Sequence, residues 1–201
     1  MPNWCENHLV IIGNKEEVSQ LINDVQSEND EGKPSYFDFE KVCPTPPELV
    51  DTIKGTGEID PKSERGQELI SKYGATNWCD WRYENWGTKW SADTNDGWDA
   101  PQFVDGEPSL FTSYINFVTA WAPPCGLIEK MAAKYPGISF IMQYCEPGMA
   151  FCGEIEYENG EGGMTEYEWD SEEGKAVRED FGYTNDGVDD DVALADMLLK
   201  G

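Results

Sequence analysis

The stretch WCENHLVIIG, residues 4–13, decides the fold of this chain. Its second half is continuously apolar, which is typical of a central strand with both faces covered. Directly after it, Asn14 and Glu17 form a variant of the capping box that begins a helix. Apolar residues then follow at helical spacing: Val18, Leu21, Ile22 and Val25. The segment therefore predicts a strand followed by an amphipathic helix.

Later segments extend this pattern. Residues 36–42 alternate apolar and polar side chains, which predicts a second strand. Residues 111–121 (FTSYINFVTAW) are β-branched and aromatic and predict a third strand. A helix over residues 123–135 and a strand over 138–145 follow. This order predicts an α+β chain with a ferredoxin-like antiparallel sheet and helices on one face.

A long insertion, from about residue 44 to 108, separates the second and third predicted strands. It contains a helical candidate at residues 63–73, and residues 77–100 hold five of the eight tryptophans. Loops of this length are uncommon inside a domain unless they are functional or disordered, and five tryptophans argue for packing. The stretch DTNDGWD, residues 93–99, lacks the ligand spacing of a calcium loop, and we interpret it as a turn.

Two acidic strands are predicted after the sheet, at residues 151–158 and 165–170, joined by the turn-rich residues 159–163. If these strands pair, six carboxylates are expected to share one face: Glu154, Glu156, Glu158, Glu166, Glu168 and Asp170. Like charges directly opposite each other destabilise a sheet, so folding alone would not select this pattern. We therefore predict a ferredoxin-like domain at residues 1–158 and an acidic extension at 159–201, which ends in a short helix at 192–199.

The whole chain is strongly acidic. Its 40 acidic and 14 basic residues give a formal charge of −26, and residues 154–201 alone carry 16 acids against 3 bases. Such a field repels nucleic acids and anionic membranes and favours cations and basic proteins. We therefore expect no direct nucleic-acid partner and no membrane partner, but a protein partner with a basic surface.

Three blocks carry a family resemblance. The opening MPNWCENHLVIIG, the central FVTAWAPP and the stretch YCEPGMAFCG at residues 144–153 resemble the YubB-like family of phage, plasmid and bacterial proteins. The similarity runs from residue 1 to about residue 160. It implies a ferredoxin-like core and a phage or mobile-element origin. It implies no activity, cofactor or catalytic residue.

The first functional hypothesis concerns the acidic hairpin. Carboxylates on one strand face repeat at a spacing similar to that of phosphates along a nucleic acid. The six carboxylates would then imitate a nucleic-acid backbone and inhibit a host nucleic-acid-binding or defence protein. The alternatives are a solvated strand edge that keeps the protein soluble and a surface that binds a divalent cation.

The second hypothesis is a nucleotide-binding pocket in the insertion. Its candidate residues combine aromatic rings with scarce cations: Trp78, Trp81, Arg82, Trp86, Lys89 and Trp90. The alternative is a small aromatic core that covers the sheet.

Catalytic and metal sites have little support in the sequence. No nucleophile elbow, phosphate-binding loop or zinc-protease motif is present, and His8 is the single histidine. We predict a non-enzymatic protein with no cofactor and no metal site, although a metal-dependent hydrolase that uses the acidic hairpin stays open. Without a signal peptide or an apolar span, we expect a cytoplasmic location. An exposed strand edge and many aromatic residues permit a homo-oligomer.

Overall fold

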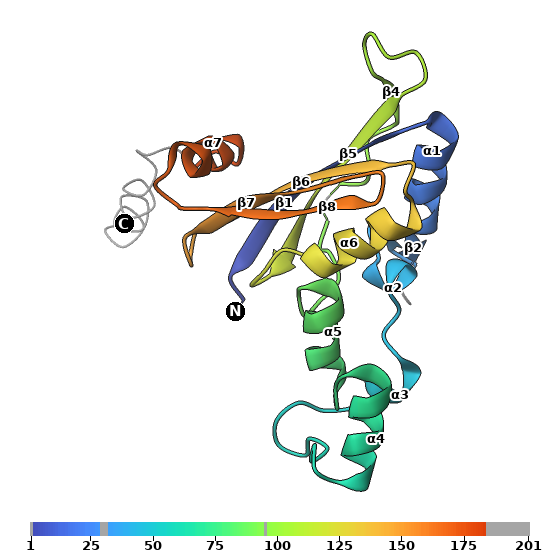
Figure 1. The fold of residues 1–201 in the computed structure, drawn as a ribbon, viewed down its shortest axis with the longest axis vertical. Coiled ribbons are helices and arrows are strands. Elements are labelled where there is room, and N and C mark those ends of the chain that lie inside the picture. The colour runs from blue at the N-terminus through green and yellow to red at the C-terminus, as the bar shows by residue number, and fades with distance from the viewer. Residues whose placement is uncertain (1, 29–31, 95, 184–201) are drawn as a thin grey trace.

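The structure of the chain is a computed structural model that describes residues 2–28, 32–94 and 96–183. Six antiparallel strands form one sheet in the order β4-β5-β1-β6-β7-β8 (Figure 1). Their bounds are β1 Trp4–Gly13, β4 Gln102–Phe103, β5 Phe111–Ala120, β6 Ser139–Glu146, β7 Phe151–Glu158 and β8 Glu161–Tyr167. The short strands β2 (Ser27–Glu28) and β3 (Pro34–Ser35) pair separately.

Two helices cover one face of this sheet. Helix α1 (Lys15–Asp24) follows β1, and α6 (Cys125–Lys134) follows β5. Their buried residues share one core with Leu9 and Ile11 of β1. Asn14 caps α1 by accepting a hydrogen bond from the backbone N–H of Glu17, as the sequence predicts. The prediction of a ferredoxin-like α+β fold is confirmed.

The predicted second strand at residues 36–42 is wrong. Asp38 instead caps a short helix, α2 (Phe39–Val42), because its carboxylate accepts from the backbone N–H of Glu40. Phe37 and Phe39 are both fully buried and pack edge to face in the main core. The apolar alternation therefore reflects a capped turn that enters the core. The sheet position beside β5 is held by β4, which pairs Gln102 with Thr112.

The insertion carries three helices: α3 (Pro47–Val50), α4 (Glu64–Tyr73) and α5 (Trp78–Trp86). Ser63 caps α4, which confirms the helical prediction at residues 63–73. Helices α3 and α4 extend away from the sheet, and α5 connects them back to it (Figure 1). Trp86 at the end of α5 joins the main core.

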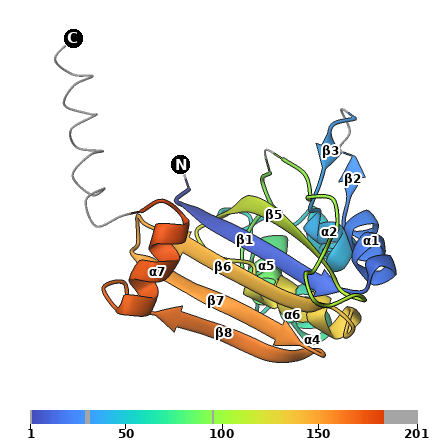
Figure 2. The same ribbon diagram turned by 90° about the horizontal axis from the view of Figure 1, so that it is seen from above.

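One further helix, which follows the sheet strands in the chain, was not predicted from the sequence. Helix α7 (Glu172–Asp180) begins at Ser171, whose hydroxyl accepts from the backbone N–H of Gly174. It lies on the sheet face opposite α6, where Val177 packs on Cys145 and Cys152 (Figure 2). Part of the segment after Asp170 is therefore ordered, and helices lie on both faces of the sheet. The predicted helix at residues 192–199 lies outside the described residues.

Candidate functional site

The hairpin register corrects the prediction about the six carboxylates. The turn contains two residues with positive φ, Asn159 at 54° and Gly160 at 80°, as in a two-residue hairpin turn. Strand β8 therefore begins at Glu161, four residues earlier than predicted, and Glu154 pairs with Thr165 while Gly153 pairs with Glu166. Directly paired residues share a face, so Glu154 and Glu166 lie on opposite faces of the sheet.

The six predicted carboxylates consequently do not form one surface. Glu154, Glu156 and Glu158 lie on the face that carries α7, which we call the open face. Glu166 lies on the α6 face, and Glu168 and Asp170 follow β8 outside the sheet. Glu161, directly opposite Glu158, adds an unpredicted acid to the open face. A continuous six-carboxylate stripe is therefore absent from the described hairpin.

Glu154 and Glu156 still interact on the open face. They line a small cavity of about 120 Å³ together with Tyr167, whose hydroxyl donates to Glu154 at 3.4 Å. Partial burial, followed by the nearby Glu156 charge, raises the pKa of the Glu154 carboxyl above its usual range. The charged form of Glu154 therefore opposes folding slightly.

We expect Glu154→Gln to stabilise the protein at neutral pH by a few tenths of a kcal/mol, because it removes one of two repelling charges. A charged carboxylate whose pKa is raised in the folded state lowers the free energy of unfolding. This destabilisation disappears as pH falls, because the carboxylate is then protonated in the folded state. The gain should therefore disappear below about pH 4, where the unfolded state is also protonated. Thermal melts at several pH values measure it, with the exposed Glu84→Gln as control. A gain that grows on acidification would contradict the assignment.

The main acidic feature of the open face is a cavity of about 610 Å³ between β1, β5 and the segment 93–99. We call it the acidic cleft. Four of its lining residues are acids: Glu6, Asp93, Asp96 and Asp99. The aromatic side chain of Tyr114, itself half-exposed, also faces this cavity, as does His8. The cleft thus combines carboxylates with aromatic surface, the combination that binds organic cations.

Backbone pairing holds Asp93 and Asp99 beside the sheet. Asp93 forms an isolated antiparallel bridge with Val118 of β5, with hydrogen bonds of 3.0 and 2.9 Å. The N–H of Asp99 donates to the carbonyl of Tyr114 at 3.0 Å. Trp98 anchors the segment by donating from its indole to the carbonyl of Tyr36. The sequence motif that resembled a calcium loop is therefore a segment that lines one wall of the cleft.

One end of the open face is covered by α7 and the residues after it. Phe181 stacks on His8 with ring centroids 4.0 Å apart, and Tyr183 donates a hydrogen bond to Glu6. Burial lowers the pKa of His8 below its ordinary value, so the imidazole is neutral at pH 7. His8 therefore adds no positive charge that would offset the carboxylates of the cleft.

No lysine or arginine occurs in any of the six sheet strands. The open face of β1, β5, β6 and β7 consequently carries acids without cations from its own strands. Helix α7 on this side carries Lys175 and Arg178, and the Arg178 guanidinium lies 4.5 Å from the centroid of the Trp169 ring. The electrostatic field over the cleft is therefore negative.

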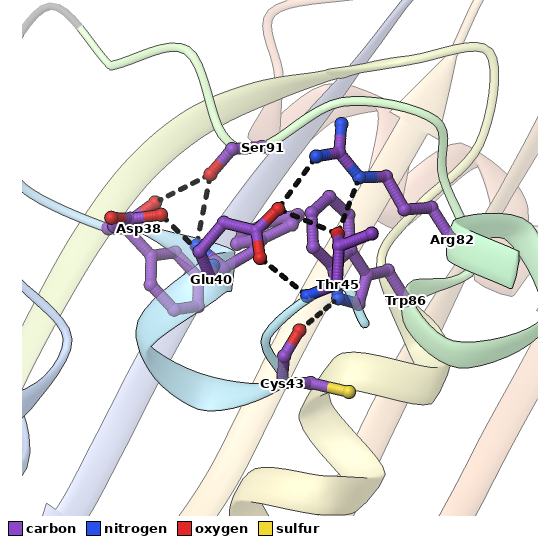
Figure 3. A network of polar contacts seen from close by, with 9 residues as sticks. Asp38, Glu40, Cys43, Thr45, Arg82, Trp86 and Ser91 are labelled. Atoms are coloured by element: carbon purple, nitrogen blue, oxygen red, sulfur yellow. Dashed lines mark hydrogen bonds and ion pairs between the residues drawn. The ribbon is translucent and has the colours of Figure 1, made fainter. Parts of the chain in front are cut away.

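Four of the six residues predicted for a nucleotide pocket in the Trp-rich insertion contact one another and neighbouring parts of the chain. Trp81 and Trp86 are buried, and the Trp86 indole donates to the carbonyl of Cys43 at 2.8 Å (Figure 3). Arg82 donates to the Glu40 carboxylate at 2.6 Å and to the Thr45 hydroxyl at 2.9 Å (Figure 3). Its guanidinium lies over the rings of Trp78 and Trp86. These contacts of Arg82 with two rings, a carboxylate and a hydroxyl stabilise the fold.

The remaining two candidates lie nearer the surface. Trp90 is 37% exposed, and the Lys89 ammonium lies 5.1 Å from its ring centroid. The same ammonium lies 5.5 Å from the Trp78 ring and 5.7 Å from the Trp121 ring. The candidates thus divide into a buried group and a surface cation–π cluster. The interpretation as a small aromatic core accounts for Trp78, Trp81, Arg82 and Trp86.

Within the described residues, no group of three or more His, Cys, Asp or Glu side chains could hold a metal ion. Among the helices of the described ranges, none is long and apolar enough to cross a membrane.

The acidic cleft was missed in the sequence because its walls are far apart along the chain. Glu6 comes from β1, and Asp93, Asp96 and Asp99 lie nearly 90 residues later. The only local signal was the acid-rich stretch at residues 93–99, which alone is typical of a turn.

The fold and this geometry define a ferredoxin-like α+β protein with an acidic open sheet face. Residues 97–188, 92 of the 201, match the family model described as the ferredoxin-like domain in Api92-like protein. That part of the chain is thus similar to a family defined by its fold, and its description states no activity.

A solved structure offers a more distant comparison. The crystal structure of the protein Api92 from Yersinia pseudotuberculosis is 12% identical, with a TM-score of 0.46, and the match covers 83% of this chain and 98% of that chain. A search of curated proteins finds no significant match.

Proposed function

We propose that this chain is a non-catalytic binding protein that engages a basic partner through the acidic cleft and the adjoining open face. The observation that carries this proposal is the cleft itself. It brings Glu6, Asp93, Asp96 and Asp99 around a cavity of about 610 Å³ on a sheet whose strands contain no lysine or arginine. Carboxylates beside aromatic rings favour lysine and arginine side chains.

The overall charge supports the same kind of partner. A formal charge of −26 accelerates association with a basic surface and suppresses association with nucleic acid. A basic surface on another protein is commonly a nucleic-acid-binding surface. We therefore propose that the partner is a nucleic-acid-binding or defence protein and that the chain competes with its nucleic acid. The resemblance of three sequence blocks to the YubB-like family implies a phage or mobile-element origin, and on that basis we propose that the target is a host protein in the host cytoplasm.

The cleft proposal replaces the six-carboxylate stripe as the molecular basis of this competition. Glu154, Glu156 and Glu158 share the open face with the cleft and extend the negative field across the sheet. They need not match phosphate spacing to attract a basic surface, because such long-range attraction depends on summed charge.

A charge-neutralising variant tests the proposal. We expect Asp93→Asn with Asp96→Asn to weaken binding of an octalysine peptide roughly three- to tenfold, since each exposed ion pair contributes about 0.2–1 kcal/mol. The matched control is Asp51→Asn with Glu84→Gln, which removes the same charge from exposed positions in the insertion. Calorimetric titration at low salt measures both affinities. Equal weakening by the two variants would show that net charge, and not the cleft, determines binding.

A further inference from the structure

One edge of the sheet is free in the described part of the chain. Strand β8 is the outermost strand, and no other described strand pairs with the side of β8 that faces away from β7 (Figure 2). The opposite edge carries β4 and the bridge between Asp93 and Val118. Six of the seven residues of β8 are exposed, and Tyr167 is partly buried. The backbone of β8 is therefore open to a further strand.

The hairpin turn determines which backbone groups of β8 lie on this free edge. In a two-residue turn, the flanking residues Glu158 and Glu161 form a hydrogen-bonded pair, and bonded and non-bonded pairs alternate from there along the ladder. Gly162, Met164 and Glu166 consequently direct their N–H and C=O groups away from β7. In the described part of the chain, no backbone hydrogen bond outside the ladders reaches these three residues. Such a row of groups is a template for strand addition.

Strand β8 lacks most of the features that usually block an edge. Its sequence, EGGMTEY, contains no lysine and no proline, and it pairs with β7 in an unbroken register without a bulge. Gly162 and Gly163 carry no side chain that would hold another strand away. The charged side chains of the strand, Glu161 and Glu166, repel an acidic strand but attract a basic one.

A second copy of this chain is a poor occupant of the edge. Two β8 strands paired with each other would bring Glu161 and Glu166 of one copy close to the same acids of the other. Like charges opposite each other destabilise a sheet, and each copy carries a formal charge of −26. Charge complementarity therefore favours a basic segment of another protein over self-association.

Two carboxylates lie one strand inward from the free edge. Glu154 pairs with Thr165 and Glu156 with Gly163, so both lie on the open face directly beside β8. The same four residues line the cavity of about 120 Å³. A Cβ added at Gly163 would meet no atom within 4 Å, so the space above this glycine is open. Among the described residues, no lysine or arginine forms an ion pair with either carboxylate.

An added strand would place its side chains on both faces of the sheet. Neighbouring strands lie about 4.7–4.9 Å apart, so the added strand would lie about 9–10 Å from β7. Its residues opposite Gly163 and Thr165 would project onto the open face, where a lysine or arginine side chain extends over Gly163 to Glu154 and Glu156. The alternate residues would lie on the α6 face beside Met164, which is 52% exposed and provides apolar surface.

We propose that β8 accepts an extended segment of another protein as a seventh, antiparallel strand of the sheet, and that this segment alternates lysine or arginine with apolar residues. Hydrogen bonds to the backbone of Gly162, Met164 and Glu166 attach the segment, and Glu154 and Glu156 select its basic side chains. The proposal rests on the proposed function in one respect, since both require a basic partner. It uses a different surface from the acidic cleft.

A heptapeptide with lysine at its odd positions and valine at its even positions is the probe. We expect the wild-type protein to bind the fluorescein-labelled peptide saturably, and Met164→Pro to weaken binding about tenfold or more. Proline removes an N–H at the centre of the free edge, but it leaves the ladder to β7 intact because that N–H faces away from β7. Met164→Ala, which keeps the N–H, should change the affinity less than about threefold. Fluorescence anisotropy gives the affinities.

Methylated versions of the peptide separate strand pairing from charge attraction. In antiparallel pairing, the valine N–H groups face β8 and the lysine N–H groups face solvent. We expect methylation of the valine nitrogens to weaken binding about tenfold or more, and methylation of the lysine nitrogens to change it less than about threefold, although both peptides keep the same charge. Glu154→Gln with Glu156→Gln should weaken the unmodified peptide about three- to tenfold.

Each contrary result has a distinct meaning. Absence of saturable binding, equal affinities of Met164→Pro and wild type, or equal affinities of the two methylated peptides would overturn strand addition at β8. Dimerisation of the wild-type protein in sedimentation that Met164→Pro abolishes would assign the edge to a second copy and overturn the proposed occupant. Urea denaturation establishes that each variant is folded. None of these results bears on the acidic cleft, which is tested separately with octalysine.

Discussion

Replacement of Trp86 by alanine is expected to lower the free energy of unfolding by about 3–5 kcal/mol, the usual range for a fully buried tryptophan. Trp86 has no exposed surface and packs edge to face against Phe39 and Trp81. The substitution also leaves the carbonyl of Cys43 without its indole donor. Urea denaturation followed by circular dichroism measures the loss.

Trp90→Ala is the matched control. It removes the same side chain from the same tryptophan-rich segment, but Trp90 is 37% exposed and its ring lies at the surface beside Lys89. We expect a loss below about 1 kcal/mol. Similar losses for both variants would contradict the division of the predicted nucleotide site into a buried core and a surface cluster.

Charge reversal in the acidic cleft has the largest expected effect on binding. We expect Asp93→Lys with Asp96→Lys to raise the concentration needed to displace DNA from a lysine-rich histone-tail peptide roughly ten- to hundredfold. The reason is that reversal both removes two attractions and adds two repulsions, each of about 0.2–1 kcal/mol. Displacement of a fluorescein-labelled duplex at low salt provides the measurement.

The control changes net charge by the same amount at a distance from the cleft. Asp51→Lys with Glu84→Lys alters exposed positions in the insertion and should displace DNA almost as well as wild type. High salt should reduce the difference between the two variants, since exposed charges are screened within about 8–10 Å at physiological ionic strength. Failure of the wild-type protein to displace DNA would count against the competition that we propose.

The sequence predicted those elements whose signals are local. The apolar run in residues 4–13 predicted β1 with its observed bounds, and the cap at Asn14 predicted where α1 begins, because strand burial and capping act within a few residues. At residues 36–42 two local signals competed. The alternation around Phe37 and Phe39 favoured a strand, and the capping ability of Asp38 favoured a helix. The helix forms, and both rings are buried in the core in that conformation.

The candidate site could be predicted only in part, because it depends on register and on contacts between distant segments. Strand β8 begins four residues earlier than the sequence predicted, and the position where it begins determines which of its residues pair with those of β7. A shift of one residue moves a whole strand to the other face, so Glu166 could not be placed without the Asn159–Gly160 turn. The pairing of Asp93 with Val118, which builds the cleft, has no signature in either segment.

The most direct test of the account is a map of where a basic ligand binds. Octalysine peptide titrated into isotopically labelled protein should shift the backbone amide resonances of Glu6, Asp93, Asp96 and Tyr114, which surround the acidic cleft. Amides of α4, which carries the exposed acids Glu64 and Glu68, should shift little. Shifts centred on α4, or spread evenly over all acidic surfaces, would contradict the claim that the cleft binds the basic partner.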